Sequence, residues 1–360
     1  MNRHTFLDID WGLLTPVLIL LILGLTTIFT ISIDLFRSQF TFSIISILFF
    51  LFFSKINYHT IKQYDLIIYI GSIFLLLLVL VVGIESRGSV RWFEIFGFRA
   101  QFSELIKPFL IFSFASFLSS QEKKSFRSFI FTLLLLAPVA LLIFLQPDLG
   151  NMLIFLFVVF LVLFNVGFPI RYFIVFFLFF AALLPIFWNF LHDYQKERLI
   201  TFLNFKNDPL GASYNAIQAI IAVGSGSFFG KGFGQGTQSV LRFLPERHTD
   251  FIFSTLAEAL GFFGALIVIA AFIYLLLKIY SIYIRSDDYF LRLVAASSFF
   301  LIFVQFLVNI GMNLGVFPIV GITLPFVSYG GSSLLSNFIL LGFLSSIMKT
   351  SKDKEILEIR

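Results

Sequence analysis

Ten long apolar runs, spread from one end of the chain to the other, constrain its fold more than any other feature. A helix rises about 1.5 Å per residue, so about 20 apolar residues cross the ~30 Å hydrocarbon core of a membrane. The sequence therefore predicts an all-α polytopic membrane protein with ten transmembrane helices in one integral membrane domain, 1–360. The runs fall near 11–32, 40–55, 65–84, 103–119, 127–145, 149–167, 170–191, 251–281, 289–313 and 326–348.

Composition agrees with this class and excludes several kinds of chemistry. Of the 360 residues, 59% are hydrophobic and 12% are charged. The chain has no cysteine, which excludes disulfides, thiolate nucleophiles and thiolate metal sites. The start lacks a cleavable signal pattern, so we expect the first helix to remain as an anchor. The four histidines are scattered and offer no two-histidine zinc spacing: His4, His59, His192 and His248.

The distribution of positive charge predicts the orientation in the membrane. An even number of spans puts both termini on one side, and lysine and arginine are enriched in cytoplasmic loops. With both termini in the cytoplasm, more than half of the cations lie on the cytoplasmic side. These are Arg3, Lys55, Lys62, Lys123, Lys124, Arg127, Arg171, Lys278, Arg285, Arg292, Lys349, Lys352, Lys354 and Arg360.

The remaining cations lie on the unfavoured outer side and predict an anionic ligand there. All but the first crowd the segments 85–107 and 192–250. They are Arg37, Arg87, Arg91, Arg99, Lys107, Lys196, Arg198, Lys206, Lys231, Arg242 and Arg247.

The outer loop 192–250, between the seventh and eighth spans, is too patterned to be a disordered tether. Within it, 213–236 begins with a helical apolar pattern and continues into a glycine-dense turn region. Long loops without structure are uncommon in compact domains. We therefore expect a structured extracytoplasmic loop that forms part of an active site.

Polar side chains inside the apolar runs are site candidates, because a charge within a span costs roughly 2.5–3.5 kcal/mol. Ser103 is a candidate helix cap, and Glu104 and Lys107 share one face of the helix that follows. Two interpretations stay open there: an ordinary helix start with a snorkelling lysine, or an intramembrane ion pair of a site. Asp148 is likewise either a helix cap after a proline turn or a site residue. Glu258, inside the eighth span, needs a partner.

Two further polar or small-residue patterns favour helix packing over chemistry. One recurs at four-residue spacing along the ninth span, and the other opens the tenth span to close approach. They are Gln305, Asn309 and Asn313, and Gly330, Gly331, Ser332 and Ser336.

The segment LPERHTDFIF at 244–253 places acids, an arginine and a histidine where the outer loop enters the eighth span. Asp250 is either the N-cap of that helix, with Thr249 as a rival, or a general base. A carboxylate at a membrane–water boundary has few competing waters and a raised proton affinity, which suits a base. Cations in the same loop would hold a phosphate leaving group.

Six motifs, distributed over nearly all of the predicted spans, carry a resemblance to a known family. They are RW at 91–92, QFSELIK at 101–107, QPDLG at 146–150, FLNFKNDPLGASYNAIQ at 202–218, VGSGSFFGKGFGQGTQSVLRFLPERHTDFIFSTLAEALGFFG at 223–264 and GMNLGVFPIVGITLPFVSYGGSS at 311–333. In order and separation they resemble the SEDS family (RodA/FtsW/SpoVE), and within it the elongation member more than the division member.

The resemblance implies a peptidoglycan glycosyltransferase of cell elongation and shape maintenance. It implies polymerisation of lipid II, the undecaprenyl-diphosphate-linked disaccharide pentapeptide, at the outer face of the bacterial cytoplasmic membrane. The implied partners are a class B penicillin-binding protein transpeptidase and membrane lipids, with no nucleic acid. By position, Asp250 matches the family's essential acidic residue, and Glu104 and Lys107 match its pair on the fourth helix. The other motif residues expected at the substrate are Arg91, Gln101, Ser103, Gln146, Asp148, Arg198, Lys231, Glu246 and His248.

The resemblance and the residues predict the same reaction. Asp250 would take the proton of the acceptor hydroxyl, which would displace undecaprenyl diphosphate with inversion. Lys107, Arg198 and Lys231 are the candidates for offsetting the charge of the leaving diphosphate. We expect a divalent cation, Mg²⁺ or Mn²⁺, to assist this reaction. The sequence does not identify the protein ligands of that cation. Three departures from the family pattern affect fine positioning only: Phe102 for proline, Ala219 for serine and Ala259 for glutamate.

Two functions of other classes stay open. A lipid II flippase would use Glu104, Lys107 and Glu258 as a polar path, but flipping needs access from both sides, and the charge outside loops lies at the outer end. A non-catalytic scaffold would only hold and activate the transpeptidase, and Asp250 would then be a helix cap.

Overall fold

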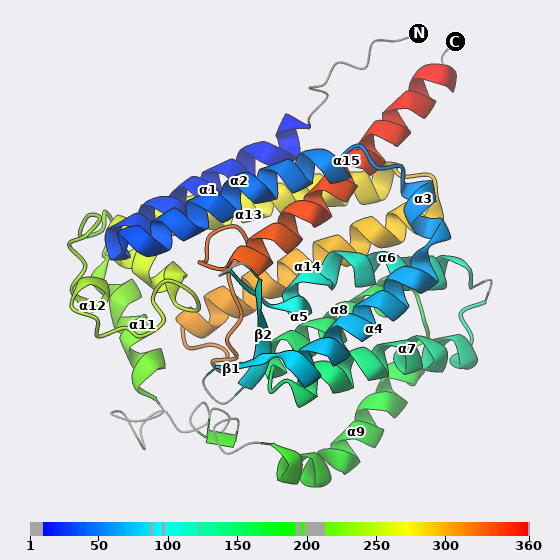
Figure 1. The fold of residues 1–360 in the computed structure, drawn as a ribbon, viewed down its shortest axis with the longest axis horizontal. Coiled ribbons are helices and arrows are strands. Elements are labelled where there is room, and N and C mark those ends of the chain that lie inside the picture. Colours follow the sequence, from blue (N-terminus) through cyan, green and yellow to red (C-terminus); the bar gives the residue numbers. More distant parts are fainter. Residues whose placement is uncertain are drawn as a thin grey trace.

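The computed structural model describes residues 10–86, 89–95, 98–121, 123–191, 196–197, 200 and 213–358. In this part of the chain, long helices run side by side in an elongated bundle that also carries one small sheet (Figure 1). The first half comprises α1 (Trp11–Ile31), α2 (Ile33–Phe53), α3 (Tyr58–Gln63), α4 (Asp65–Val82), β1 (Ile84–Ser86), β2 (Ser89–Ile95), β3 (Phe98–Ala100), α5 (Phe102–Leu105), α6 (Lys107–Ser119), α7 (Phe126–Leu145), α8 (Leu149–Val166) and α9 (Ile170–Phe190). The second half comprises α11 (Tyr214–Ser225), α12 (Thr237–Val240), α13 (Ile252–Arg285), α14 (Tyr289–Asn313) and α15 (Gly331–Glu358).

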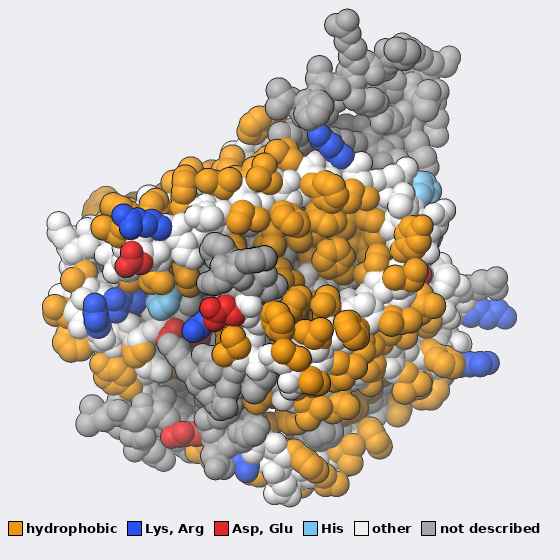
Figure 2. Space-filling view, in the orientation of Figure 1, with side chains coloured by type: hydrophobic (Ala, Val, Ile, Leu, Met, Phe, Trp, Pro, Cys, Tyr) orange, Lys and Arg blue, Asp and Glu red, His pale blue; other side chains and the backbone are white. Residues whose placement is uncertain are grey.

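The predicted helical membrane architecture is confirmed. Eight helices among the described residues are long and apolar enough to cross a membrane. Two shorter apolar helices, Lys107–Ser119 and Ile170–Ile186, stand where the fourth and seventh spans are predicted. Figure 2 shows apolar side chains over the middle of one face, with lysines and arginines toward its two ends, as a membrane-spanning bundle requires.

The second span begins earlier than predicted, at Ile33 instead of near residue 40. Ser32 caps α2, since its side chain accepts a hydrogen bond from the Leu35 N–H (3.5 Å). Asp34 and Arg37 lower the hydropathy at the start of this helix, so the apolar pattern begins later than the helix does. Their side chains point outward and are 93% and 76% exposed.

The two ends of the bundle differ. Figure 1 shows α11 and α12 at one end, which we call the α11–α12 end. The short helix α3 lies at the opposite end, and α1 begins and α15 ends toward it. The segment that follows α4, predicted only as an outer loop, forms an antiparallel sheet in the order β1-β2-β3. Arg91 lies on its central strand.

A break in α13 corrects the prediction of one continuous span over 251–281. Gly261 has a φ of 67° and a ψ of −160°, which no helical residue adopts. The backbone of the glycine-dense segment 226–232 lies in this break. It forms hydrogen bonds with backbone groups of α13 that the break leaves without a helical partner, because unpaired backbone groups are costly in apolar surroundings. The bonds are Lys231 N–H to Glu258 O (3.0 Å), Gly232 N–H to Ala259 O (2.9 Å) and Phe262 N–H to Ser227 O (2.8 Å).

Replacing Gly261 by alanine is expected to lower the free energy of unfolding. A Cβ at this position would lie 2.3 Å from the Gly230 nitrogen and 2.6 Å from the Phe228 oxygen. Backbone strain of this kind costs about 1–3 kcal/mol before the clash is counted. Thermal denaturation in detergent would measure the loss. Gly224→Ala is the control, since no atom lies within 4 Å of the added Cβ. Equal melting temperatures for the two variants would contradict the proposed role of the break.

Candidate functional site

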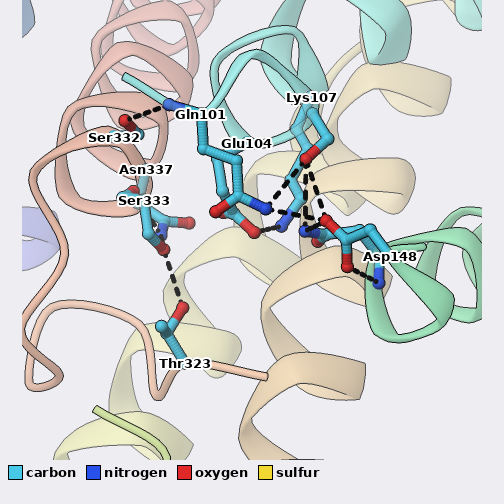
Figure 3. A network of polar contacts seen from close by, with 10 residues as sticks. Gln101, Glu104, Lys107, Asp148, Thr323, Ser332, Ser333 and Asn337 are labelled. Carbon is cyan, nitrogen blue, oxygen red and sulfur yellow. Dashed lines mark hydrogen bonds and ion pairs between the residues drawn. The ribbon is translucent and has the colours of Figure 1, made fainter. Parts of the chain in front are cut away.

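Asp148, at the start of α8, gathers three side chains around one carboxylate oxygen (Figure 3). Its Oδ2 accepts hydrogen bonds from Gln101 Nε2 (2.7 Å), Ser103 Oγ (3.1 Å) and Asn151 Nδ2 (2.9 Å). Its Oδ1 accepts from the Asn151 N–H (3.3 Å) and so caps the helix. The residue is 4% exposed. The cap interpretation of Asp148 is therefore confirmed, and the same carboxylate is also the centre of a buried polar network.

Glu104 and Lys107 form a buried ion pair beside this network (Figure 3). Lys107 Nζ lies 2.7 Å from Glu104 Oε1, and Lys107 is only 1% exposed. The interpretation of Lys107 as a snorkelling lysine is therefore wrong. The second carboxylate oxygen of Glu104, Oε2, is buried and has no hydrogen-bond partner among the described residues.

A short helix break places this pair. α5 ends at Leu105 and α6 begins at Lys107, and Pro108 occupies the first turn of α6, where a missing N–H costs nothing. Ser103 is not the predicted cap, because Gln101 precedes α5 and no side chain caps it. Ser103 is directed instead to Asp148.

The start of α15 closes the other side of the network. Ser332 Oγ accepts a hydrogen bond from the Gln101 N–H (2.9 Å), and Thr323 Oγ1 and Ser333 Oγ lie 2.9 Å apart (Figure 3). The sequence predicted only close helix packing for Ser332. Its hydrogen bond across 231 positions of the chain has no local sequence signal.

Asp250 lies in a turn that is hydrogen-bonded to the bundle. Its backbone carbonyl accepts from Asn309 Nδ2 (3.1 Å) and Asn313 Nδ2 (2.9 Å) of α14. The N-cap position of α13 is Phe251, and no side chain caps it. The cap interpretation is therefore wrong for both Asp250 and Thr249. Asp250 is half-buried at the point where the loop meets the bundle.

The residues before Asp250 are held by the segment that precedes α15. The carbonyl of His248 accepts from the Tyr329 N–H (2.8 Å), and the two rings lie 5.6 Å apart. The Glu246 carboxylate accepts from Thr249 Oγ1 (3.2 Å). Glu246 has a φ of 48°, a left-handed conformation that non-glycine residues rarely adopt. The predicted residues Glu246, His248 and Asp250 are thus brought together in one constrained turn.

Glu258 has the partner that the sequence requires. Lys231 Nζ lies 3.4 Å from Glu258 Oε1, and the glutamate is completely buried. The same carboxylate accepts from the N–H of Gln238 (2.9 Å) and from the N–H and Oγ of Ser239 (3.0 and 2.8 Å). Lys231, predicted as a substrate cation, therefore helps to bind the outer loop to α13.

The remaining predicted residues are more dispersed. Gln146 is buried, and its Nε2 donates to the Leu76 carbonyl (3.0 Å), which ties α7 to α4. Arg91 is half-buried on β2, and its Nε has no hydrogen-bond partner. Arg198 lies outside the described residues. Among the residues that the structure describes, no cluster of three His, Asp or Glu side chains could hold a metal ion.

Comparison with known proteins agrees with this geometry. A family model for FtsW, RodA and SpoVE, described as cell cycle protein, matches residues 10–353. The peptidoglycan glycosyltransferase MrdB of Escherichia coli K12 is 42% identical over 282 residues, which are 78% of this chain and 76% of MrdB. The stage V sporulation protein E of Bacillus subtilis is 35% identical over 322 residues, which are 88% of this chain and 87% of that protein.

Two solved structures share the fold over almost the whole chain. A chain from a peptidoglycan synthase complex that coordinates polymerization and crosslinking has a TM-score of 0.83 and 30% identity, covering 96% of this chain and 99% of its own. The rod shape determining protein RodA of Thermus thermophilus has a TM-score of 0.72 and 28% identity, covering 95% and 98%.

A double-mutant cycle on Glu104 and Lys107 is expected to reveal strong coupling in stability. Lys107→Met alone leaves a buried carboxylate without its cation, which costs about 3–5 kcal/mol. Adding Glu104→Gln removes that charge, so the double variant should be more stable than Lys107→Met. Thermal denaturation of the purified proteins would measure the difference. Additive effects of the two substitutions would contradict the pairing.

Proposed function

Since this chain belongs to the FtsW, RodA and SpoVE family, and is a multi-pass peptidoglycan glycosyltransferase of cell elongation, we propose that it polymerises lipid II with Asp250 as the general base. The observation that carries this proposal is the placement of Asp250. Its turn is fixed to α14 through two asparagine amides, and it directly precedes Phe251, the N-cap position of α13. A backbone held in this way fixes the position from which the Asp250 side chain can face a substrate.

The proposed reaction is a single displacement at the donor sugar. The acceptor hydroxyl gives its proton to the Asp250 carboxylate as its oxygen bonds to the anomeric carbon of the donor. The bond from that carbon to the diphosphate oxygen breaks, and undecaprenyl diphosphate leaves with the electron pair. Attack opposite to the leaving group inverts the configuration at the anomeric carbon. General-base assistance of this kind typically contributes about 10²–10⁴-fold to the rate.

Glu104 and Lys107 are proposed to orient a substrate beside this base. Glu104 Oε2 is buried and unpaired among the described residues, so it can accept a hydrogen bond from a sugar hydroxyl. Lys107 holds the other oxygen of that carboxylate at 2.7 Å. Gln101, Ser103 and Asp148 would support this arrangement through their shared network.

A second proposal concerns the side of the membrane. We place the α11–α12 end outside the cell and both termini in the cytoplasm, because the opposite end has the lysine- and arginine-rich connections Lys55–Lys62 and Lys123–Arg127. Lipid II would then be polymerised at the outer face of the bacterial cytoplasmic membrane.

The proposed partner is a class B penicillin-binding protein transpeptidase, which would crosslink the product. Support comes from the similar chain found in a peptidoglycan synthase complex. A Mg²⁺ or Mn²⁺ bound together with the substrate diphosphate stays a prediction, and no step of the reaction above is assigned to it.

Asp250→Asn is expected to reduce polymer formation by at least about 100-fold, because the amide cannot take the hydroxyl proton. Purified protein, fluorescent lipid II and gel separation of the glycan strands would measure the loss. Asp34→Asn is the control, since this aspartate lies at the exposed start of α2 with 93% of its side chain in solvent. It should retain full activity.

This assay, with a measurement of lipid II movement across vesicles, separates the enzyme from a flippase. Polymer lost in Asp250→Asn and retained in Asp34→Asn supports the enzyme. Wild-type protein that moves lipid II across vesicles without joining it would support a flippase. Undiminished polymer from a folded Asp250→Asn protein would end the assignment of the base.

A further inference from the structure

A cavity at the α11–α12 end lies between the end of α1, the turn before α13 and the first turns of α13. Its volume is about 140 Å³, roughly ten times the ~10–15 Å³ that one water needs. Two arginines line it, Arg242 and Arg247. Figure 2 shows positively charged side chains gathered over this end of the molecule.

The positive charge of this cavity is not compensated within the described chain. Arg247 Nε is buried and has no hydrogen-bond partner in the part of the chain that the structure describes. Burial lowers the pKa of Arg247 below its ordinary value, and the neighbouring charge of Arg242 lowers it further. Three ion pairs among the described residues, Arg37–Asp34, Lys107–Glu104 and Lys231–Glu258, include neither arginine of the cavity.

The hydroxyls around the cavity are already used as donors. Thr27 and Thr30 donate to carbonyls of α1 (both 2.7 Å), and Thr255 donates to the Arg247 carbonyl (3.1 Å). The guanidinium groups are therefore the side-chain donors of the cavity lining that remain available for a ligand. A buried cation without a partner is costly, and guanidinium groups bind phosphate through paired, parallel hydrogen bonds.

A carboxylate behind the cavity wall belongs to Glu258. Its Oε2 lies against Ser239, which lines the cavity, but Glu258 is already bound by Lys231 and by donors from 238–239. It therefore does not offset the arginines.

We propose that Arg242 and Arg247 form a binding site for the phosphate oxygens of a membrane lipid and, resting on the proposed function, that this lipid is the polyprenyl diphosphate carrier of the sugar substrate. Arg247 belongs to the same turn as Asp250. The N–H groups of Thr249 and Phe251 donate to the Glu246 carbonyl (3.1 and 3.2 Å), so Arg247 and Asp250 are held in one hydrogen-bonded unit.

Backbone strain in this turn agrees with a binding role. Arg242 has a φ of 63° and Glu246 a φ of 48°, both in the left-handed region that non-glycine residues rarely adopt. Strained residues of this kind cluster at ligand clamps and active sites.

The test uses Arg242→Gln, Arg247→Gln and the double variant in nanodiscs of zwitterionic phosphatidylcholine. Inorganic pyrophosphate serves as the competitor in the lipid II polymerisation assay. The double variant is expected to raise both the KM for lipid II and the inhibition constant of pyrophosphate by about 10- to 100-fold, since hydrogen bonds to charged groups are lost. Arg285→Gln, at the far end of α13, removes an exposed cation and should change neither value.

The outcomes separate this inference from the proposed function. Wild-type protein that forms no polymer would refute the proposed function, whereas polymerisation with unchanged KM and inhibition constant in the double variant would refute the arginine site alone. If the double variant does not fold, the same two measurements on the single variant Arg242→Gln test the arginine site, because the Arg242 side chain is exposed.

A final arm identifies the lipid. Undecaprenyl diphosphate added to the nanodiscs should inhibit wild-type protein more strongly than the double variant. Equal inhibition by phosphatidylglycerol would refute the assignment to the carrier and indicate a phospholipid headgroup instead.

Discussion

The rest of the site depends on the ion pair and hydrogen bonds of one carboxylate that is buried between α13 and the outer loop. Glu258 is completely buried, and its donors come from the loop through Lys231, Gln238 and Ser239. Removing those donors would leave an unpaired charge in an apolar bundle, at a cost of several kcal/mol. The loop therefore cannot leave α13 without a large loss of stability. That attachment fixes the path of the chain over the break at Gly261 and, beyond it, the turn that carries Asp250.

A second set of bonds fixes the same turn from the bundle side. Asn309 and Asn313 hold the carbonyl of Asp250, and Asn309 also holds the carbonyl of Ile322 (2.7 Å), in the segment before α15. The same segment contains Thr323, which reaches the start of α15 and the network of Asp148. The turn that carries Asp250 and the start of α15 are thus both attached to the segment that precedes α15. Dipoles fixed before the substrate arrives need little rearrangement during reaction.

The features that were predictable from the sequence are those whose physics is local. Hydropathy averaged over about 20 residues identifies spans, and Asp148 caps α8 through an amide only three positions away. Asp250 looked equally suited to cap a helix, but α13 begins at Ile252, with Phe251 at the cap position. The break at Gly261 gave no signal, because glycine is common in membrane helices. Its partner segment begins more than 30 positions earlier, and no local pattern encodes that pairing.

The cations that the sequence predicts on the outer side fall into two groups, which the sequence alone does not distinguish. Lys107 and Lys231 each lie within 3.4 Å of a buried carboxylate, so their charge stabilises the fold and orients that carboxylate. Arg242 and Arg247 line a cavity without such a partner. An enzyme that expels a diphosphate needs positive charge that its own carboxylates have not neutralised. The number of cations on the outer side therefore predicts an anionic ligand there. Only the contacts in the folded chain distinguish the cations that pair with a buried carboxylate from those that remain available to bind the ligand.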